Sequence, residues 1–184
     1  MPGVDELYIL ARGVLLDALE ALSEHRGAAR LVGHDARSVR IVRGLEGVLV
    51  DRDRMAIGSL QAEDSRSLEI QVAGSAALLI AKMHKIQDRQ GTSRHGDKDA
   101  LGVLRLLRGT STEEMAGRFR RVLLDPDSRA AAETAAKWLF QQFGSPRGDG
   151  VAMTRQAIGP LGDPEEISAS CVALVSDLRR AIGD

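Results

Sequence analysis

The stretch that decides the fold runs from Leu68 to Arg89 and reads Leu68-Glu-Ile-Gln-Val-Ala-Gly-Ser-Ala-Ala-Leu-Leu-Ile-Ala-Lys-Met-His-Lys-Ile-Gln-Asp-Arg89. Its first five residues alternate between apolar and polar side chains, which predicts a β-strand with one apolar face. From Ser75 the apolar residues recur at steps of three and four, which predicts a helix over residues 75–89 that a Gly-Ser pair can cap. The chain is therefore expected to change from strand to helix at Gly74.

Upstream of this stretch, the pattern predicts one helix and then short strands. Apolar residues recur at helical spacing over residues 4–25, and a basic turn followed by Gly27 is typical of a helix end. Residues 30–72 instead contain short apolar stretches cut by Gly, Asp and Ser, which predict two to four strands. These stretches are Val39–Val42, Gly47–Val50, Met55–Ile57 and Leu68–Val72.

Downstream, the pattern is helical to the end of the chain. We expect helices over residues 97–108, from Ser111 to about Leu124, from Asp125-Pro126 to about Phe143, and from Asp163-Pro164 to about Ile182, with a linker over residues 144–150. The predicted fold class is α+β, with a small mixed or antiparallel sheet at residues ~30–72 followed by a C-terminal helical bundle. The predicted division is a domain over residues 1–109 and a helical region over residues 110–184.

Composition places the chain among ordinary globular proteins. It has 184 residues with a net charge of -1, and it is 43% hydrophobic and 28% charged. The near-zero net charge argues against a dedicated DNA-binding protein, although a local basic patch stays compatible with it. Aromatic residues make up only 3% of the chain, so Leu, Val, Ile and Ala must build most of the core.

The lone cysteine, Cys171, excludes an internal disulfide and a cysteine-based zinc site. It lies inside an apolar helical pattern, which indicates a buried small side chain rather than a nucleophile. No apolar run approaches the about 18 residues that a membrane span needs. Asp5 and Glu6 stand where a signal peptide would be basic, so we expect a cytoplasmic protein without a membrane partner.

A basic stripe is the feature most suggestive of function. Lys82, Lys85 and Arg89 are spaced i, i+3, i+7, which places them within about 60° of one another around the 75–89 helix. The following loop adds Arg94 and His95, and the next helix begins Asp97-Lys98-Asp99. Cations so placed suit the phosphates of a nucleotide, and a carboxylate nearby could orient a lysine or bind a metal. The alternative interpretation is a solvated charged face with Asp97 as an ordinary helix cap.

Residues 72–108 resemble a known family. An apolar helix ends in Lys82-Met-His-Lys-Ile-Gln-Asp-Arg89, a loop follows, and then Lys98-Asp99-Ala-Leu-Gly102 opens a leucine-rich helix. This order and spacing are similar to those of the bacterial nucleotidyltransferase-like proteins of the abortive-infection (AbiEii-type) toxin family, particularly its actinobacterial branch. The resemblance extends more loosely to residues 44–53, to the first helix and to the C-terminal helices.

The resemblance implies a reduced nucleotidyltransferase-like fold and assigns roles to residues. Lys82 would be the active-site lysine that faces the nucleotide phosphates, and Asp99 the acid that supports it. The neighbouring cations Lys85, Arg89 and Lys98 would bind substrate. An active enzyme of this family would use Mg²⁺ and an NTP. RNA or tRNA would be a possible acceptor of the nucleotide, and an antitoxin would be a possible protein partner.

The sequence departs from this family in two places. Gly102 stands where the family usually has its second acid. Upstream, Asp51-Arg52-Asp53 is the only convincing Asp-x-Asp, but arginines flank its acids and only six residues separate it from Gly44. We therefore interpret residues 51–54 as a charged turn between two strands, and we expect the catalytic strands to be missing. The residues of a metal site stay unknown.

Three hypotheses remain open from the sequence. The first is an enzyme that transfers a nucleotide from an NTP to a hydroxyl of an RNA, a protein or a small molecule. The second is a catalytically degenerate relative that binds a nucleotide, an RNA or a protein. The third is a structural interaction domain whose charged helix pair is only solvated surface.

Overall fold

The computed structural model describes residues 28–29, 39–40, 43–61, 63–90 and 96–183. The chain divides into two compact units, Met1–Val42 and Arg43–Asp184. In the first unit, β1 (Ala28–Ala29) pairs antiparallel with β2 (Val39–Arg40). The predicted strand Val39–Val42 is confirmed over its first two residues. The predicted helix over residues 4–25 lies outside the described residues.

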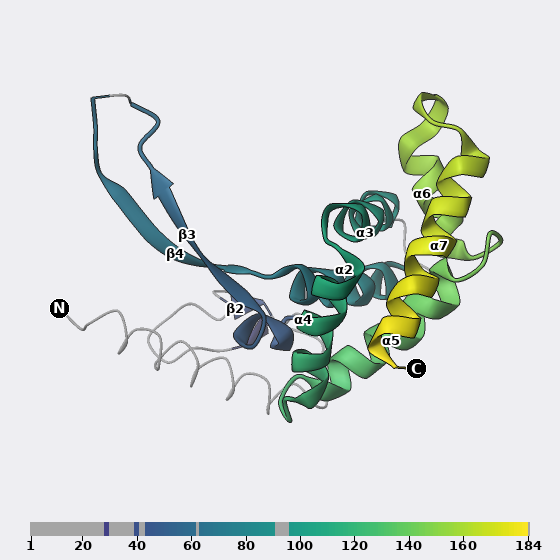
Figure 1. The fold of residues 1–184 in the computed structure, drawn as a ribbon, viewed down its shortest axis with the longest axis horizontal. Helices are drawn as coiled ribbons and strands as arrows, with labels where there is room; N and C mark the ends of the chain where they lie inside the picture. The colour runs from purple at the N-terminus through teal and green to yellow at the C-terminus, as the bar shows by residue number, and fades with distance from the viewer. Residues whose placement is uncertain (1–27, 30–38, 41–42, 62, 91–95, 184) are drawn as a thin grey trace. The chain divides into compact units, whose positions relative to one another are not determined.

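The second unit contains an antiparallel hairpin. Strands β3 (Arg52–Gly58) and β4 (Ser67–Ala73) pair along their whole length, so that Met55 lies opposite Ile70. Figure 1 shows this hairpin extending away from the helices of the same unit. The predicted strands at Met55–Ile57 and Leu68–Val72 are confirmed, because alternation of apolar and polar residues reports the two faces of a pleated strand.

The predicted strand over Gly47–Val50 is wrong. Residues Glu46–Leu49 form a short 3-10 helix, η2, instead. The hairpin ladder ends where the Gly74 N–H donates to the Asp51 carbonyl, and α2 begins at the next residue, so no strand lies opposite residues 47–50. The tight turn packs Gly47 near Ala77 and Val122, where a side chain would have little room.

Helices make up the rest of the second unit. They are α2 (Ser75–Arg89), α3 (Asp97–Gly109), α4 (Thr112–Leu124), α5 (Arg129–Phe143), α6 (Asp149–Ile158), the short 3-10 helix η3 (Gly159–Leu161) and α7 (Pro164–Ile182). The predicted caps at the starts of α4 and α7 are confirmed. The Ser111 Oγ accepts from the Glu114 N–H at 3.2 Å, and the Asp163 carboxylate accepts from the Glu165 N–H at 2.8 Å. The fold is α+β, as the sequence predicted.

Two helix boundaries differ from the prediction. Asp125-Pro126 does not open α5, because the Asp125 carboxylate accepts from the backbone of Asp127 and Ser128 and so forms a turn. This use of an Asp side chain competes with helix formation. Further on, α6 begins at Asp149, inside the segment expected to be a linker, and it buries Val151 in the core.

Helix α2 lies at the centre of the core. Most of its apolar side chains are almost completely buried, with Leu78, 39% exposed, as the largest exception, and it packs against α3, α4, α5 and η2. The expected domain boundary between residues 109 and 110 falls inside this core, because Leu107 of α3 and Met115 of α4 belong to the same cluster of buried side chains. Among the residues that the structure describes, no helix is both long and apolar enough to cross a membrane.

The position of Cys171 gives a first prediction. Its side chain is 1% exposed on α7, and burial raises the pKa of its thiol, so the reactive thiolate is scarce in the folded protein. A thiol reagent such as DTNB at pH 8 should label the native protein far more slowly than the protein in 6 M guanidinium. Complete labelling of the native protein within minutes would contradict this packing of α7.

Candidate functional site

The structure brings most of the predicted site residues together around one carboxylate. Asp99 lies in the first turn of α3, and its side chain is only 5% exposed. The Lys82 and Lys85 Nζ atoms lie 3.6 and 3.2 Å from its Oδ1, and the Arg89 Nη1 lies 2.7 Å from its Oδ2. We call these four residues the Asp99 cluster. The stripe predicted on α2 therefore exists, but it faces the acid of α3 rather than solvent alone.

Gly102 explains how Lys82 reaches this acid. A Cβ at residue 102 would lie 2.6 Å from both Cε and Nζ of Lys82, so the lysine side chain occupies the space that a side chain at 102 would need. The departure from the family pattern at Gly102 thus has a structural consequence. An acid at this position would sit against the Lys82 ammonium, and its absence leaves the ammonium to Asp99.

The remaining predicted cations are placed differently. Lys98 is exposed on the first turn of α3, and no ion pair joins it to another residue of the described ranges. Arg94 and His95 lie outside the described residues. In the Asp99 cluster, Lys82, Lys85 and Arg89 keep 29%, 52% and 26% of their side chains exposed. All three cations lie within 3.6 Å of this one buried carboxylate, so positively charged side chains gather here and stay partly exposed.

Asp51 forms a second and different cluster. Its side chain is completely buried, and its Oδ2 accepts hydrogen bonds from the Ala76 and Ala77 N–H groups at 2.9 and 3.0 Å. These N–H groups belong to the first turn of α2, which has no acidic residue of its own there. A carboxylate at this point satisfies unpaired N–H groups and opposes the helix dipole. The interpretation of residues 51–54 as a charged turn is therefore wrong, because Asp51 caps a helix and the others lie in β3.

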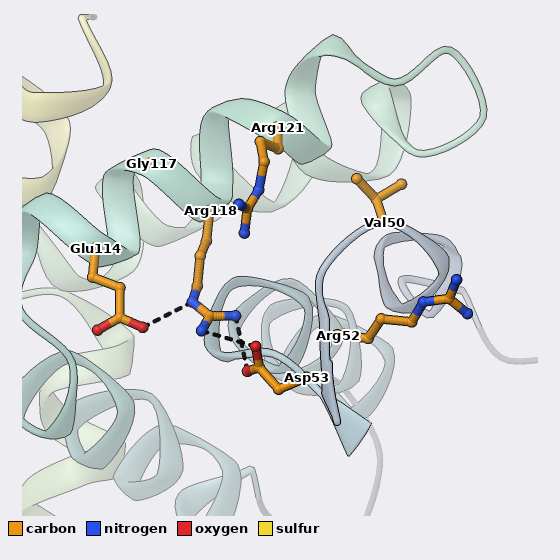
Figure 2. A pocket seen from close by; sticks show the side chains of 7 residues that line it. All are labelled: Val50, Arg52, Asp53, Glu114, Gly117, Arg118 and Arg121. Atoms are coloured by element: carbon orange, nitrogen blue, oxygen red, sulfur yellow. Dashed lines mark hydrogen bonds and ion pairs between the residues drawn. The ribbon is translucent and has the colours of Figure 1, made fainter. Parts of the chain in front are cut away.

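Arg118 of α4 joins this cap to the hairpin. It donates to Asp51 Oδ1 at 2.9 Å, to Asp53 Oδ1 at 3.1 Å and to Glu114 Oε1 at 2.9 Å. Figure 2 shows its side chain between the carboxylates of Glu114 and Asp53. The hydrogen bonds to Asp53 and then Asp51 raise the pKa of the Arg118 guanidinium further above its usual range. Arg118 borders an open pocket of about 550 Å³, lined by Val50, Arg52, Asp53, Glu114, Gly117, Arg118 and Arg121.

The carboxylates of this pocket do not fit a magnesium site. Mg²⁺ binds carboxylate oxygens in a near-octahedral shell, and a two-metal nucleotidyltransferase needs several of them. Both Asp51 oxygens already accept from the start of α2 and from Arg118, and Asp53 is bonded to the same arginine. Within the described ranges, no group of three or more His, Cys, Asp and Glu residues could hold a metal ion.

A third polar site was missed by sequence reasoning. A pocket of about 360 Å³ is lined by Gln87, Gln90, Trp138, Gln141, Gln142, Arg147, Gly148 and Asp149. The Gln142 Nε2 donates to the Gln87 Oε1, and the Gln87 Nε2 donates to the Gln90 Oε1. These residues come from the C-terminal end of α2, from α5, and from the loop before α6 and its first residue, and no motif in the sequence joins them. Their common amide chemistry becomes visible only when the helices pack.

Comparison of the chain with protein-family models, with curated proteins and with solved structures gives no significant match. The resemblance of residues 72–108 to the nucleotidyltransferase-like toxins therefore stays a prediction. Conclusions about function must rest on the geometry of the clusters themselves.

The Asp51 cap gives a second prediction. Asp51→Ala should lower the free energy of unfolding by about 3 kcal/mol, because it leaves Arg118 without its buried partner. Gly74→Ala should also be destabilising, because its Cβ would lie 2.3 Å from Asp51 Oδ1. Urea denaturation followed by circular dichroism measures both effects.

The matched control is Gly117→Ala. A Cβ there meets nothing within 4 Å, and alanine is favoured over glycine inside a helix by about 1 kcal/mol. This variant should therefore be as stable as the wild type or more stable. Equal stabilities of Gly74→Ala and Gly117→Ala would show that Gly74 does not need its close approach to Asp51.

Proposed function

We propose that this protein is a non-catalytic phosphate-binding module, which binds the phosphates of a nucleotide or of RNA at the Asp99 cluster. The observation that carries the proposal is the excess of cations at one place. Lys82, Lys85 and Arg89 all lie within ion-pair distance of Asp99, and all three keep part of their side chains in contact with solvent. Phosphate oxygens accept strong charge-assisted hydrogen bonds from such groups.

The buried position of Asp99 supports a binding role. A buried carboxylate fixes three flexible side chains in one region, so less conformational entropy is lost when they contact a ligand. Lys98 lies in the same turn of α3 and adds a further exposed cation. The cations of α2 follow one helix face at a rise of about 1.5 Å per residue, so the stripe runs for about 10 Å, a length that suits several linked phosphates.

Nucleotidyl transfer is the other function that the family resemblance implies, and the geometry favours it less. Lys82 does lie beside Asp99, as an active-site lysine and its acid would. The acids that would have to hold the metal ions are used otherwise: Asp51 caps α2, and Asp53 pairs with Arg118. We therefore assign no chemical step to the cluster.

Binding should depend on the excess positive charge. Gly102→Asp places a new carboxylate against the Lys82 ammonium, so it should weaken the binding of ATP, and of a short single-stranded RNA, at least tenfold, or by about 1.4 kcal/mol. Titration calorimetry measures ATP, and fluorescence anisotropy measures labelled RNA. RNA binding should also weaken steeply with added salt, and a clear preference for one of the two ligands identifies the source of the phosphate.

The matched control is Gly117→Asp. It adds the same charge inside a helix, beside the Arg118 pocket and in open space. It should leave binding unchanged, and Lys85→Ala should weaken it. If Gly117→Asp weakens binding as much as Gly102→Asp, the phosphate lies at the Arg118 pocket and the proposal for the Asp99 cluster fails.

A transfer assay separates binding from catalysis. We expect no label to pass from α-³²P-labelled NTPs to total tRNA or to the protein itself in the presence of magnesium, because the carboxylates near Arg118 are already occupied. Label transfer that disappears in Lys82→Ala would overturn the non-catalytic assignment and restore the enzyme hypothesis.

A further inference from the structure

The β3–β4 hairpin exposes an apolar face. Residues opposite each other in an antiparallel pair point to the same side of the sheet, so Met55 and Ile70 share a face, as do Ile57 and Leu68. Met55, Ile57 and Leu68 are 51%, 48% and 65% exposed. A two-stranded hairpin is at best marginally stable alone in water, and it gains stability from a third strand or from covering of its apolar face. An additional strand paired to the hairpin would supply the first of these two kinds of support.

The hydrogen bonds at the two ends of the hairpin define which backbone groups face outward. The Ser59 N–H donates to the Arg66 carbonyl, and the Gly74 N–H donates to the Asp51 carbonyl. Bonded and non-bonded pairs alternate along an antiparallel ladder, so Ile70 bonds inward to Met55. The backbone groups of Glu69 and Gln71 therefore point out from the edge of β4 that no other described strand pairs with, and another strand could bond to them there.

We propose that this edge binds the same edge of a second copy of the chain, antiparallel and about a twofold axis at Ile70. Ile70 then lies opposite Ile70 of the second copy, and Leu68 lies opposite Val72 of the second copy. Glu69 and Gln71 of the two copies exchange backbone hydrogen bonds. The apolar residues of both β4 strands form one continuous face of a four-stranded sheet, and each copy supplies the same surface to the other.

Other registers of β4 against itself are less favourable. An axis at Glu69 places two like charges opposite each other, which destabilises a sheet. An axis at Leu68 places Ile70 opposite Arg66. Axes at Gln71 or Val72 bring the second strand against Gly74, which is buried at the start of α2.

On the polar face of the proposed sheet, Arg54 Nη1 of each copy already lies 3.7 Å from Glu69 Oε2 of the same hairpin, so the charges are paired before the copies meet. Arg54 lies opposite Gln71 in the hairpin, and Gln71 would lie opposite Glu69 of the second copy. Each row across the interface thus runs from a cation through an amide to a carboxylate. The outer edge of β3 offers no such match, because an axis at Met55 would place Ile57 opposite Asp53, which is already paired with Arg118.

Cross-linking of the full chain tests the register. In a non-hydrogen-bonded antiparallel pair the Cα atoms are about 4.5 Å apart, within the range of a disulfide. Mild oxidation of Ile70→Cys should therefore give a covalent dimer on non-reducing gels. Met55→Cys is the matched control, because it lies opposite Ile70 on the same face but on the outer strand, and it should stay uncrosslinked. Cys171 is buried, so the wild type should also stay uncrosslinked.

Sedimentation velocity gives an independent test on the unmodified chain. The wild type should be a dimer at micromolar concentration. Ile70→Arg places two guanidinium groups at the axis and should weaken the dimer at least tenfold, whereas Ala56→Arg, on the polar face of the outer strand, should not. A monomeric wild type overturns the proposal. A dimer in which Met55→Cys cross-links as readily as Ile70→Cys also overturns it, because the hairpins would then pack face to face.

Discussion

The Asp51 carboxylate is the interaction on which the arrangement of the second unit depends. It is fully buried, it accepts from the first turn of α2, and it pairs with Arg118 of α4. Its own backbone carbonyl closes the hairpin ladder at Gly74. One residue therefore connects the hairpin, the central helix and α4. A buried charge is costly unless its partners are complete, so each of these elements holds the others in position.

A second buried carboxylate, Asp99 of α3, lies beside the C-terminal half of the central helix, and its surroundings have the opposite balance. Asp51 receives backbone N–H groups, Arg118, which Asp53 and Glu114 also bind, and Arg121 at 3.6 Å. Asp99 instead has three cations around it. The first arrangement leaves little charge for a ligand and stabilises the fold. The second leaves positive charge at the surface and therefore suits an anion. This contrast favours the Asp99 cluster over the Arg118 pocket as the proposed phosphate site.

Sequence reasoning succeeded where the information is local. Alternation predicted β3 and β4, helical periodicity predicted α2 and α3, and the caps at Ser111 and Asp163 predicted the starts of α4 and α7. It failed where the conformation depends on a pairing strand that is missing from the described residues, or on which of two local hydrogen-bonding patterns a side chain adopts. Gly47–Val50 has the composition of a strand but no strand to pair with. Asp125 is a residue type that favours the starts of helices, but its carboxylate accepts from the Ser128 N–H and so forms a turn.

The sequence by itself determined the fold class and the helix face that carries Lys82, Lys85 and Arg89, because both follow from the periods of strands and helices. It also identified Asp99 as the acid beside them. Only the tertiary structure decided that all three cations lie around this one carboxylate. It also decided that the Lys82 side chain packs against Gly102, and that Asp51 caps a helix 25 residues away in sequence. The physical reason is that burial and pairing of charge depend on which elements meet, and this is set by packing of the whole core.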